Sequence, residues 1–138
     1  MLSTTALEKY IKKEICSKLG EVGWNCINFK KGYKNSIEGT YIYSQNNTYH
    51  ILYVEKGEIR EKKIMLKKED VLLYVIDIIS FDIAMDYAEK NRKEGEDFRR
   101  ELFRKEIEIY SLFGDEYERK KRNEIEKILK RNPYSDDL

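Results

Sequence analysis

Residue types that often carry catalysis or crosslinks are scarce in this chain. Its 138 residues include one histidine, one proline and two cysteines. Cys16 and Cys26 have neither CxxC spacing nor a second pair of ligands, so they form no recognisable zinc site. A single disulfide would not hold together a domain of this length, and we expect both thiols to be reduced. The sequence therefore predicts no metal and no cofactor.

An excess of charge of either sign is also missing. Lys and Arg together number 27, and Asp and Glu together number 26. Nucleic-acid-binding domains usually carry a clear basic excess, so nucleic acid is not the partner that we expect. The stretch MLSTTALEKYIKKEI contains no apolar run of the kind that a secretory signal has. We accordingly expect no secretory signal.

The sequence also lacks an uninterrupted hydrophobic segment of membrane-spanning length. The most apolar stretch, EDVLLYVIDIISFDIAMDYAEKNR, contains Asp77, Asp82 and Asp86. Each aspartate would cost roughly 2.5–3.5 kcal/mol near the centre of a bilayer. We therefore expect a soluble helix that is buried on most of its circumference, and no membrane association.

The residues that are present predict one α+β domain over residues 1–138. Hydrophobic residues make up 41% of the chain, which is enough to build a core. Thr5 begins a capping box and Gly20 suits a helix end, which predicts a helix over 6–19. An antiparallel sheet of about three to four strands should follow over 26–66, packed on a bundle of three helices over 69–131. Residues 132–138 should form a tail.

Two turn signals organise the predicted sheet. Asn46-Asn47 and Lys56-Gly57 can adopt the positive φ angles of two-residue hairpin turns. Regular alternation then assigns the side chains to two faces. The face that we expect to suit the core carries Tyr41, Tyr43, Leu52, Val54 and Ile59. The half-polar, tyrosine-rich face carries Thr40, Ile42, Ser44, Tyr49, Ile51, Tyr53, Arg60 and Lys62.

The three helices are expected over about 69–93, 98–113 and 116–131. Asp97 and Asp115 should cap the second and third of them. The break near Gly95 makes the first two an antiparallel pair, which would bring Asp86 near Arg104 and Glu89 near Arg100. We therefore expect a polar network that holds the fold together, made of Asp86, Glu89, Arg92, Asp97, Arg100 and Arg104.

The acidic and histidine side chains give no good catalytic pattern. Asp82 and Asp86 lie one helical turn apart, but basic residues follow nearby and no histidine does, so ion pairs or solvated edges are the expectation. His50 lies in the middle of a predicted strand without a convincing serine, cysteine or aspartate partner. We expect no catalytic residue and no enzymatic activity.

Four consecutive segments of the chain resemble bacterial immunity protein family 63. They are YHILYVEKGEIREKKI, EDVLLYVIDIISFDIAMDYAEKNR, EDFRRELFRKEIEIYSLF and ERKKRNEIEKILKRNPYSDD. The family pattern is matched at Tyr49-His50, Lys56-Gly57, Asp70 through Tyr74, Phe81 through Arg92, Asp97 through Phe103, and Pro133 through Asp136. Val75 stands where the family pattern has tryptophan, a difference that should affect packing more than function. The resemblance runs from about Gly39 to the end of the chain.

This resemblance implies an immunity protein of a polymorphic toxin or contact-dependent growth inhibition system. Such a protein lies in the cytoplasm of the producing cell and its kin. It binds the C-terminal domain of one cognate toxin, often a nuclease, and blocks it without catalysis. The partner-binding residues would then lie on the second sheet face or on the tail. The candidates are Tyr49, Tyr53, Arg60 and Lys62 on the sheet, and Tyr134, Asp136 and Asp137 on the tail.

The alternative function is a nucleic-acid-binding or regulatory module that uses the basic last helix. In ERKKRNEIEKILKR, Lys120, Lys121 and Arg122 would contact phosphates. Three glutamates interrupt this run at spacings that favour pairs within the helix, namely Glu118, Glu124 and Glu126. A solvated helical face explains the run as well.

Overall fold

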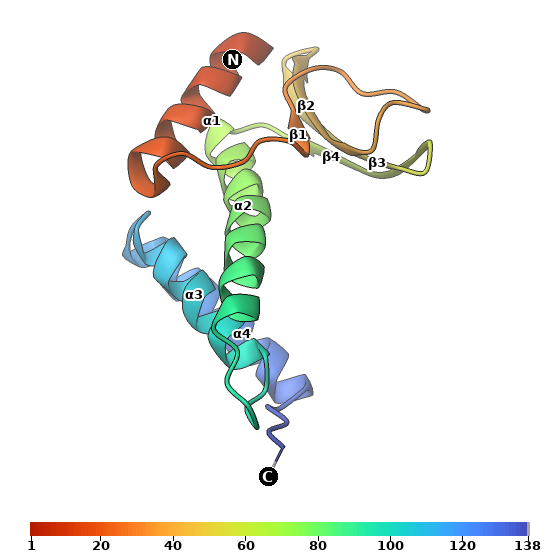
Figure 1. Ribbon diagram of the computed structural model, residues 1–138. Coiled ribbons are helices and arrows are strands. Elements are labelled where there is room, and N and C mark those ends of the chain that lie inside the picture. The colour runs from red at the N-terminus through yellow and green to blue at the C-terminus, as the bar shows by residue number, and fades with distance from the viewer. Residues whose placement is uncertain (138) are drawn as a thin grey trace. The chain divides into compact units, whose positions relative to one another are not determined.

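The computed structural model describes residues 1–137. Contacts between residues group the chain into two compact units. The N-terminal unit, Met1–Val75, contains helix α1 and four strands. The C-terminal unit, Ile76–Leu138, contains helices α3 and α4. Helix α2 (Lys68–Lys90) crosses the boundary between the units (Figure 1). The fold is α+β, as predicted, with an N-terminal helix, a four-stranded sheet and three C-terminal helices.

Helix α1 (Thr4–Leu19) begins two residues earlier than the sequence predicted. Its cap is Ser3, whose Oγ accepts the amide of Ala6 at 3.2 Å, so the capping box expected at Thr5 does not form. Serine and threonine cap almost equally well. Thr4 instead links the helix to the sheet: its Oγ1 accepts a hydrogen bond from the amide of Ser44 at 3.0 Å. The predicted end at Gly20 is confirmed.

The sheet contains β1 (Ile27–Asn28), β2 (Gly39–Gln45), β3 (Thr48–Glu55) and β4 (Glu58–Met65), in that spatial order. Both predicted hairpins form, with positive φ at Asn46, Asn47, Lys56 and Gly57. Strand β1 pairs with β2 in parallel, so the sheet is mixed and the prediction of a fully antiparallel sheet was wrong at this strand. The connecting segment 29–38 is long enough to return the chain to the end where β1 began.

A β-bulge in β4 changes the register that simple alternation predicted. Val54 pairs with Ile59, but Tyr53 pairs with Glu61, which leaves Arg60 as the extra residue. Beyond a one-residue insertion every side chain moves to the opposite face. Lys62 therefore lies opposite Leu52, on the other face from the one predicted.

Both faces of the sheet bury side chains, so the expectation that one face suits the core was incomplete. On the half-polar face, Ile42, Tyr49 and Ile51 are at most 2% exposed, and the Tyr49 hydroxyl accepts the amide of Leu2 at 3.0 Å. This face meets the start of α1. The other face holds a separate cluster of Tyr41, Tyr43, Leu52 and Val54, with Ile59 packed against it.

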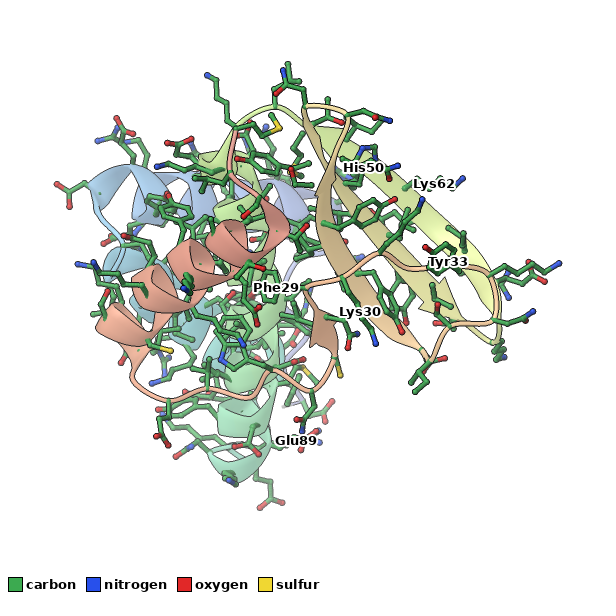
Figure 2. All side chains as sticks on the ribbon, turned by 90° about the horizontal axis from the view of Figure 1, so that it is seen from above. Phe29, Lys30, Tyr33, His50, Lys62 and Glu89 are labelled. Atoms are coloured by element: carbon green, nitrogen blue, oxygen red, sulfur yellow. The ribbon has the colours of Figure 1, made fainter. Side chains whose placement is uncertain are left out.

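The segment 29–38 covers this second cluster (Figure 2). Gly32 lies against the Tyr41 ring, and the amide of Asn35 donates to the carbonyl of Gly57 at 2.9 Å. His50 stacks on Tyr43 with ring centroids 5.0 Å apart, and its Nε2 lies 2.9 Å from the Thr48 hydroxyl. His50 is therefore a packed strand residue.

Gly32→Ala should lower the free energy of unfolding by about 1–3 kcal/mol, because the new methyl group would overpack the cluster. An ideal Cβ at this position would lie 2.6 Å from Cγ of Tyr41. Gly23→Ala is the matched control, since a Cβ there meets nothing within 4 Å. Urea denaturation measures both, and equal midpoints for the two variants would contradict the described path of the segment.

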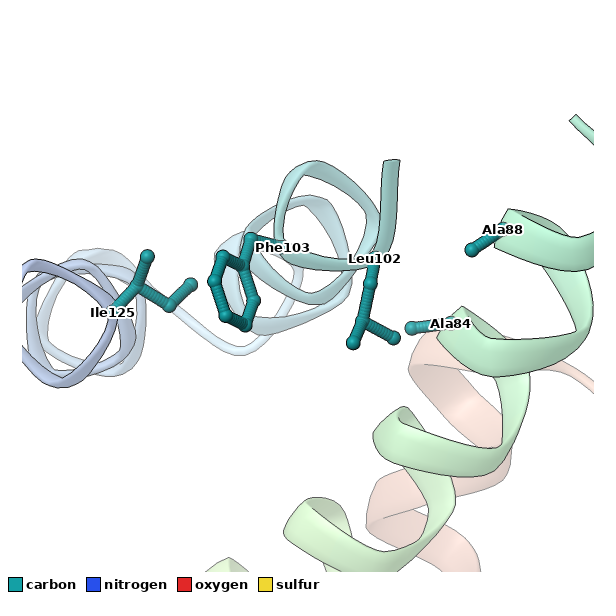
Figure 3. Close-up of a cluster of buried hydrophobic side chains, with 5 residues drawn as sticks. All are labelled: Ala84, Ala88, Leu102, Phe103 and Ile125. Atoms are coloured by element: carbon teal, nitrogen blue, oxygen red, sulfur yellow. The ribbon is translucent and has the colours of Figure 1, made fainter. Parts of the chain in front are cut away.

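Helices α3 (Arg99–Ser111) and α4 (Asp115–Arg131) form an antiparallel hairpin that turns at Gly114. Asp115 is the first residue of α4, and its expected role as the cap is taken by Gly114. Figure 3 shows the core of this unit: Ile125 on α4 faces Phe103 on α3, and Leu102 on α3 faces Ala84 and Ala88 on α2. The two alanines, one turn apart on α2, are the side chains against which Leu102 packs.

Candidate partner-binding surface

The C-terminal tail folds back onto the start of α3. The Asp136 carboxylate accepts the amide of Asp97 at 2.6 Å and both Nε and Nη2 of Arg100, at 3.1 and 2.8 Å. The Arg100 guanidinium lies 4.1 Å from the centre of the Tyr134 ring, which packs in turn near Phe103. Bidentate pairing and ring stacking together fix the orientation of the tail.

A second set of contacts holds the same tail at residues 132–135, just before Asp136. Asp97 accepts the amides of Arg99 at 2.9 Å and Ser135 at 2.8 Å, and it pairs with the Arg99 guanidinium at 2.9 Å. Arg99 also donates to the carbonyls of Asn132 and Pro133. We call this set the tail clasp; it comprises Asp97, Arg99, Arg100, Tyr134 and Asp136.

The tail clasp should open in acid. Hydrogen bonds from Arg99 and Ser135 hold the pKa of Asp97 well below its usual range, and hydrogen bonds from Arg100 and Asp97 lower the pKa of Asp136. A carboxylate with a lowered folded-state pKa stabilises above its ordinary value, here 3.8, and loses that contribution as the pH falls further. The NMR signals of the Tyr134 ring should therefore stay constant from neutral pH downward and shift below that value.

Asp136→Asn provides the comparison for this titration. Its tail signals should resemble the released state already at neutral pH, because an amide cannot form the charged pair with Arg100. Circular dichroism at each pH separates tail release from loss of the helices. Tyr134 signals that do not respond to either change would show that the clasp does not hold the tail.

A shallow groove runs along the α3–α4 seam beside the clasp. It consists of two adjoining hollows of about 250 and 510 Å³ that share Ile107, Arg122 and Ile125. Arg100, Phe103, Arg104 and Tyr134 complete the smaller hollow. Glu126, Leu129 and Lys130 complete the larger one. The floor is thus apolar and the edges are charged, which is the usual composition of a protein-binding site.

The predicted sheet residues do not form one common surface. Tyr49 is buried, and Tyr53 is half-buried with its hydroxyl donating to Glu55 at 2.9 Å. Arg60 and Lys62 are exposed, but the bulge places Lys62 on the face opposite Tyr53. In the tail, Tyr134 is half-buried, whereas Asp136 and Asp137 are exposed. The tail therefore brings its predicted residues closer together than the sheet does.

The pairs expected between α2 and α3 are not the ones formed. Asp86 pairs with Lys90 at 2.9 Å, and Arg104 pairs with Glu101 at 2.6 Å. Arg100 is engaged by Asp136 in place of Glu89. Within residues 1–137, Glu89 and Arg92 are exposed and have no ion pair. The predicted Glu89–Arg100 pair was wrong because the tail, which the prediction did not include, brings Asp136 to Arg100. The predicted Asp86–Arg104 pair was wrong because each residue pairs within its own helix.

Sequence reasoning missed an ion cluster at the helix interface. Lys121 on α4 lies 3.4 Å from Glu106 on α3 and 3.1 Å from Glu124, and the Lys121 and Glu106 side chains are only 12% and 7% exposed. Burial raises the pKa of Glu106, with Lys121 opposing it. Burial disfavours the charge on Lys121, but Glu106 and Glu124 raise its pKa. The signal was available: Lys121 lies one turn before Ile125 on the apolar side of its helix.

The remaining candidates considered for catalysis or metal binding are Asp77 and the two cysteines. Asp77 is exposed, although burial raises its pKa to about 6 against the opposing Lys121 and Lys120 charges. Water solvates such an exposed carboxylate readily, so we assign the shift no catalytic meaning. Among residues 1–137 no group of His, Cys, Asp or Glu has the arrangement of a metal site. Cys16 and Cys26 are unpaired and exposed.

The basic run of α4 is largely neutralised within the unit. Arg122 pairs with Glu118 at 2.8 Å, and Lys130 pairs with Glu126 at 3.8 Å. Lys121 points into the ion cluster described above. The largely buried Lys121 is therefore unavailable to phosphate, which removes one of the cations that the nucleic-acid alternative requires. In the described part of the chain, no helix is long and apolar enough to cross a membrane.

Comparisons with known proteins give a family match. The model of the family described as "Immunity protein 63" matches residues 45–127, which is more than half of the chain. The match covers β3, β4, α2, α3 and most of α4. No curated protein matches the chain, and no solved structure matches it.

Proposed function

Because this chain belongs to the immunity protein 63 family, we propose that it neutralises the C-terminal domain of a cognate bacterial toxin by binding to it. The family match over residues 45–127 is the observation that carries this proposal. Binding would be stoichiometric and without catalysis, in the cytoplasm of a cell that uses a polymorphic toxin or contact-dependent growth inhibition system.

We place the binding surface on the C-terminal unit, at the tail and the adjoining α3–α4 seam. The tail clasp holds Tyr134 and Asp136 in one orientation before a partner arrives. Preorganised side chains bind with a smaller loss of conformational entropy than mobile ones. Tyr53, Arg60 and Lys62 on the sheet remain the alternative candidates, although Tyr53 and Lys62 lie on opposite faces, and Asp137 extends the first surface.

Co-expression with the toxin domain encoded beside this gene tests the function. Cells that express the toxin domain alone should stop growing, and cells that express both proteins should grow. The purified proteins should form a one-to-one complex by calorimetry, and a nuclease assay is the first activity to examine. Failure of the protein to bind or protect against any toxin encoded beside it would exclude this function.

A further inference from the structure

We propose that the α3–α4 groove receives an acidic amphipathic helix of the partner protein. This inference rests on the proposed function and specifies the chemistry of the partner. The floor of the groove contains Phe103 and Ile107, one turn apart on α3, and Ile125 and Leu129, one turn apart on α4. Two parallel apolar rows at this spacing match the i, i+3/i+4, i+7 anchors of a helix.

The edges of the groove determine the charge of the occupant. Four cations line the two hollows, against one carboxylate, Glu126. The cations are Arg100, Arg104, Arg122 and Lys130. A helix with aspartate or glutamate beside its apolar stripe would complement both floor and edges.

Two of the edge cations, Arg122 and Lys130, can change partners at little cost. The side chains of Arg104 and Arg122 are each 59% exposed, and that of Lys130 is 75% exposed. Their present carboxylate partners lie three or four residues away on the same helix. The Arg122–Glu118 and Lys130–Glu126 pairs contribute only about 0.2–0.5 kcal/mol each, so carboxylates of an incoming helix can replace them. Arg104 pairs with Glu101, whose side chain is only 6% exposed, so Arg104 would keep that partner.

The length of the groove sets the length of the contact. The residues that line it on α4 run from Arg122 to Lys130, which corresponds to about 12 Å at 1.5 Å per residue. This distance accommodates about two turns of a partner helix. The occupant would therefore pack on the hairpin as an added helix, on the apolar seam where α3 meets α4.

Two other occupants fit the groove less well. A second copy of this chain, paired by a two-fold axis at the groove, would bring its edge cations against an identical set. Nucleic acid would use the cations but would leave the apolar floor without a complementary surface. We therefore commit to the acidic helix and treat the other two as outcomes of the test.

The test compares two double charge reversals on the same unit. Arg122→Glu with Lys130→Glu alters the groove, whereas Arg119→Glu with Lys127→Glu makes the same charge change at exposed positions on the same helix that do not line it. The groove variant should bind the toxin domain about tenfold or more weakly, because like charges replace attractive contacts. The control variant should bind within about twofold of the unaltered protein. Thermal unfolding must show that both variants remain folded.

A second probe makes the test independent of the toxin. A synthetic helical peptide with leucines at i, i+4 and i+7 and flanking glutamates should shift the NMR methyl signals of Ile107, Ile125 and Leu129. Its basic counterpart, with lysines in place of the glutamates, should not. If the toxin does not bind at all, the proposed function fails and the peptide alone decides the chemistry of the groove.

Three results would overturn the proposal. One is full toxin binding by the groove variant, which would leave the proposed function intact but place the interface elsewhere. Another is a dimer, detected by light scattering, that the groove reversal dissociates. The third is affinity for single-stranded DNA that the same reversal removes.

Discussion

Replacing Phe103 by alanine is expected to lower the free energy of unfolding of the C-terminal unit by about 3–5 kcal/mol. Phe103 is 7% exposed and belongs to the cluster formed with Ala84, Ala88, Leu102 and Ile125. Loss of its ring removes the packing between α3 and α4 and leaves a cavity that two helices joined by a short turn cannot close. Urea denaturation followed by circular dichroism measures the change.

Phe113→Ala is the matched control for this substitution. Phe113 is only half-buried and packs at a tilt against Tyr117 with ring centroids 5.9 Å apart, so its loss should cost about 1 kcal/mol. Phe103→Ala should also release the tail, because Tyr134 packs 6.3 Å from the Phe103 ring. A variant at Phe103 that is as stable as the Phe113 variant would contradict the described core.

Replacing Lys121 by methionine should cost about 3 kcal/mol, the second largest effect that we predict. The substitution leaves the buried Glu106 carboxylate without its partner cation. Neutralisation of both residues, in Lys121→Met with Glu106→Leu, should restore most of the loss, because apolar side chains of similar size pack well at such a site. Lys120→Met, at an exposed neighbouring position, should change stability by less than about 0.5 kcal/mol.

The pH dependence distinguishes a lost charge pair from lost packing. Burial raises the folded-state pKa of Glu106 above its ordinary value of 4.5. A carboxylate with a raised folded-state pKa favours the folded state increasingly as the pH falls through that pKa toward the ordinary value. The deficit of Lys121→Met should therefore be smaller at pH 5 than at pH 7.5. A deficit that does not change with pH would indicate a packing defect instead.

The hairpins and helix positions were predictable because their signals are local. Asn46, Asn47 and Gly57 adopt positive φ readily through their own conformational preferences, and Lys56 adopts it as the first residue of its two-residue turn. Gly20 and Gly114 likewise end or begin helices through backbone freedom that other residues lack. These features need only a few neighbouring residues, so the sequence specifies them directly.

The features that the sequence did not predict depend on distant segments. The bulge at Arg60 alters the pairing of β4 with β3 without any turn signal, and it separates Lys62 from Tyr53. Arg100 had two possible acidic partners, and only the path of the tail decides for Asp136 over Glu89. The tail residues of the candidate surface were predicted individually, but the groove beside them requires the α3–α4 packing to be known.

The edge position of β4 has a consequence for how this protein behaves in concentrated solution. An open strand offers its backbone to other chains and can nucleate fibrils. Here the strand carries a bulge together with Arg60, Lys62 and Lys63, all of them exposed. Lysines and irregular pairing are the devices that prevent one sheet from extending into the next. These features of strand β4 should therefore prevent amyloid-like assembly. A variant that lacks Arg60 and carries Lys62→Thr and Lys63→Thr should form fibrils that bind thioflavin T.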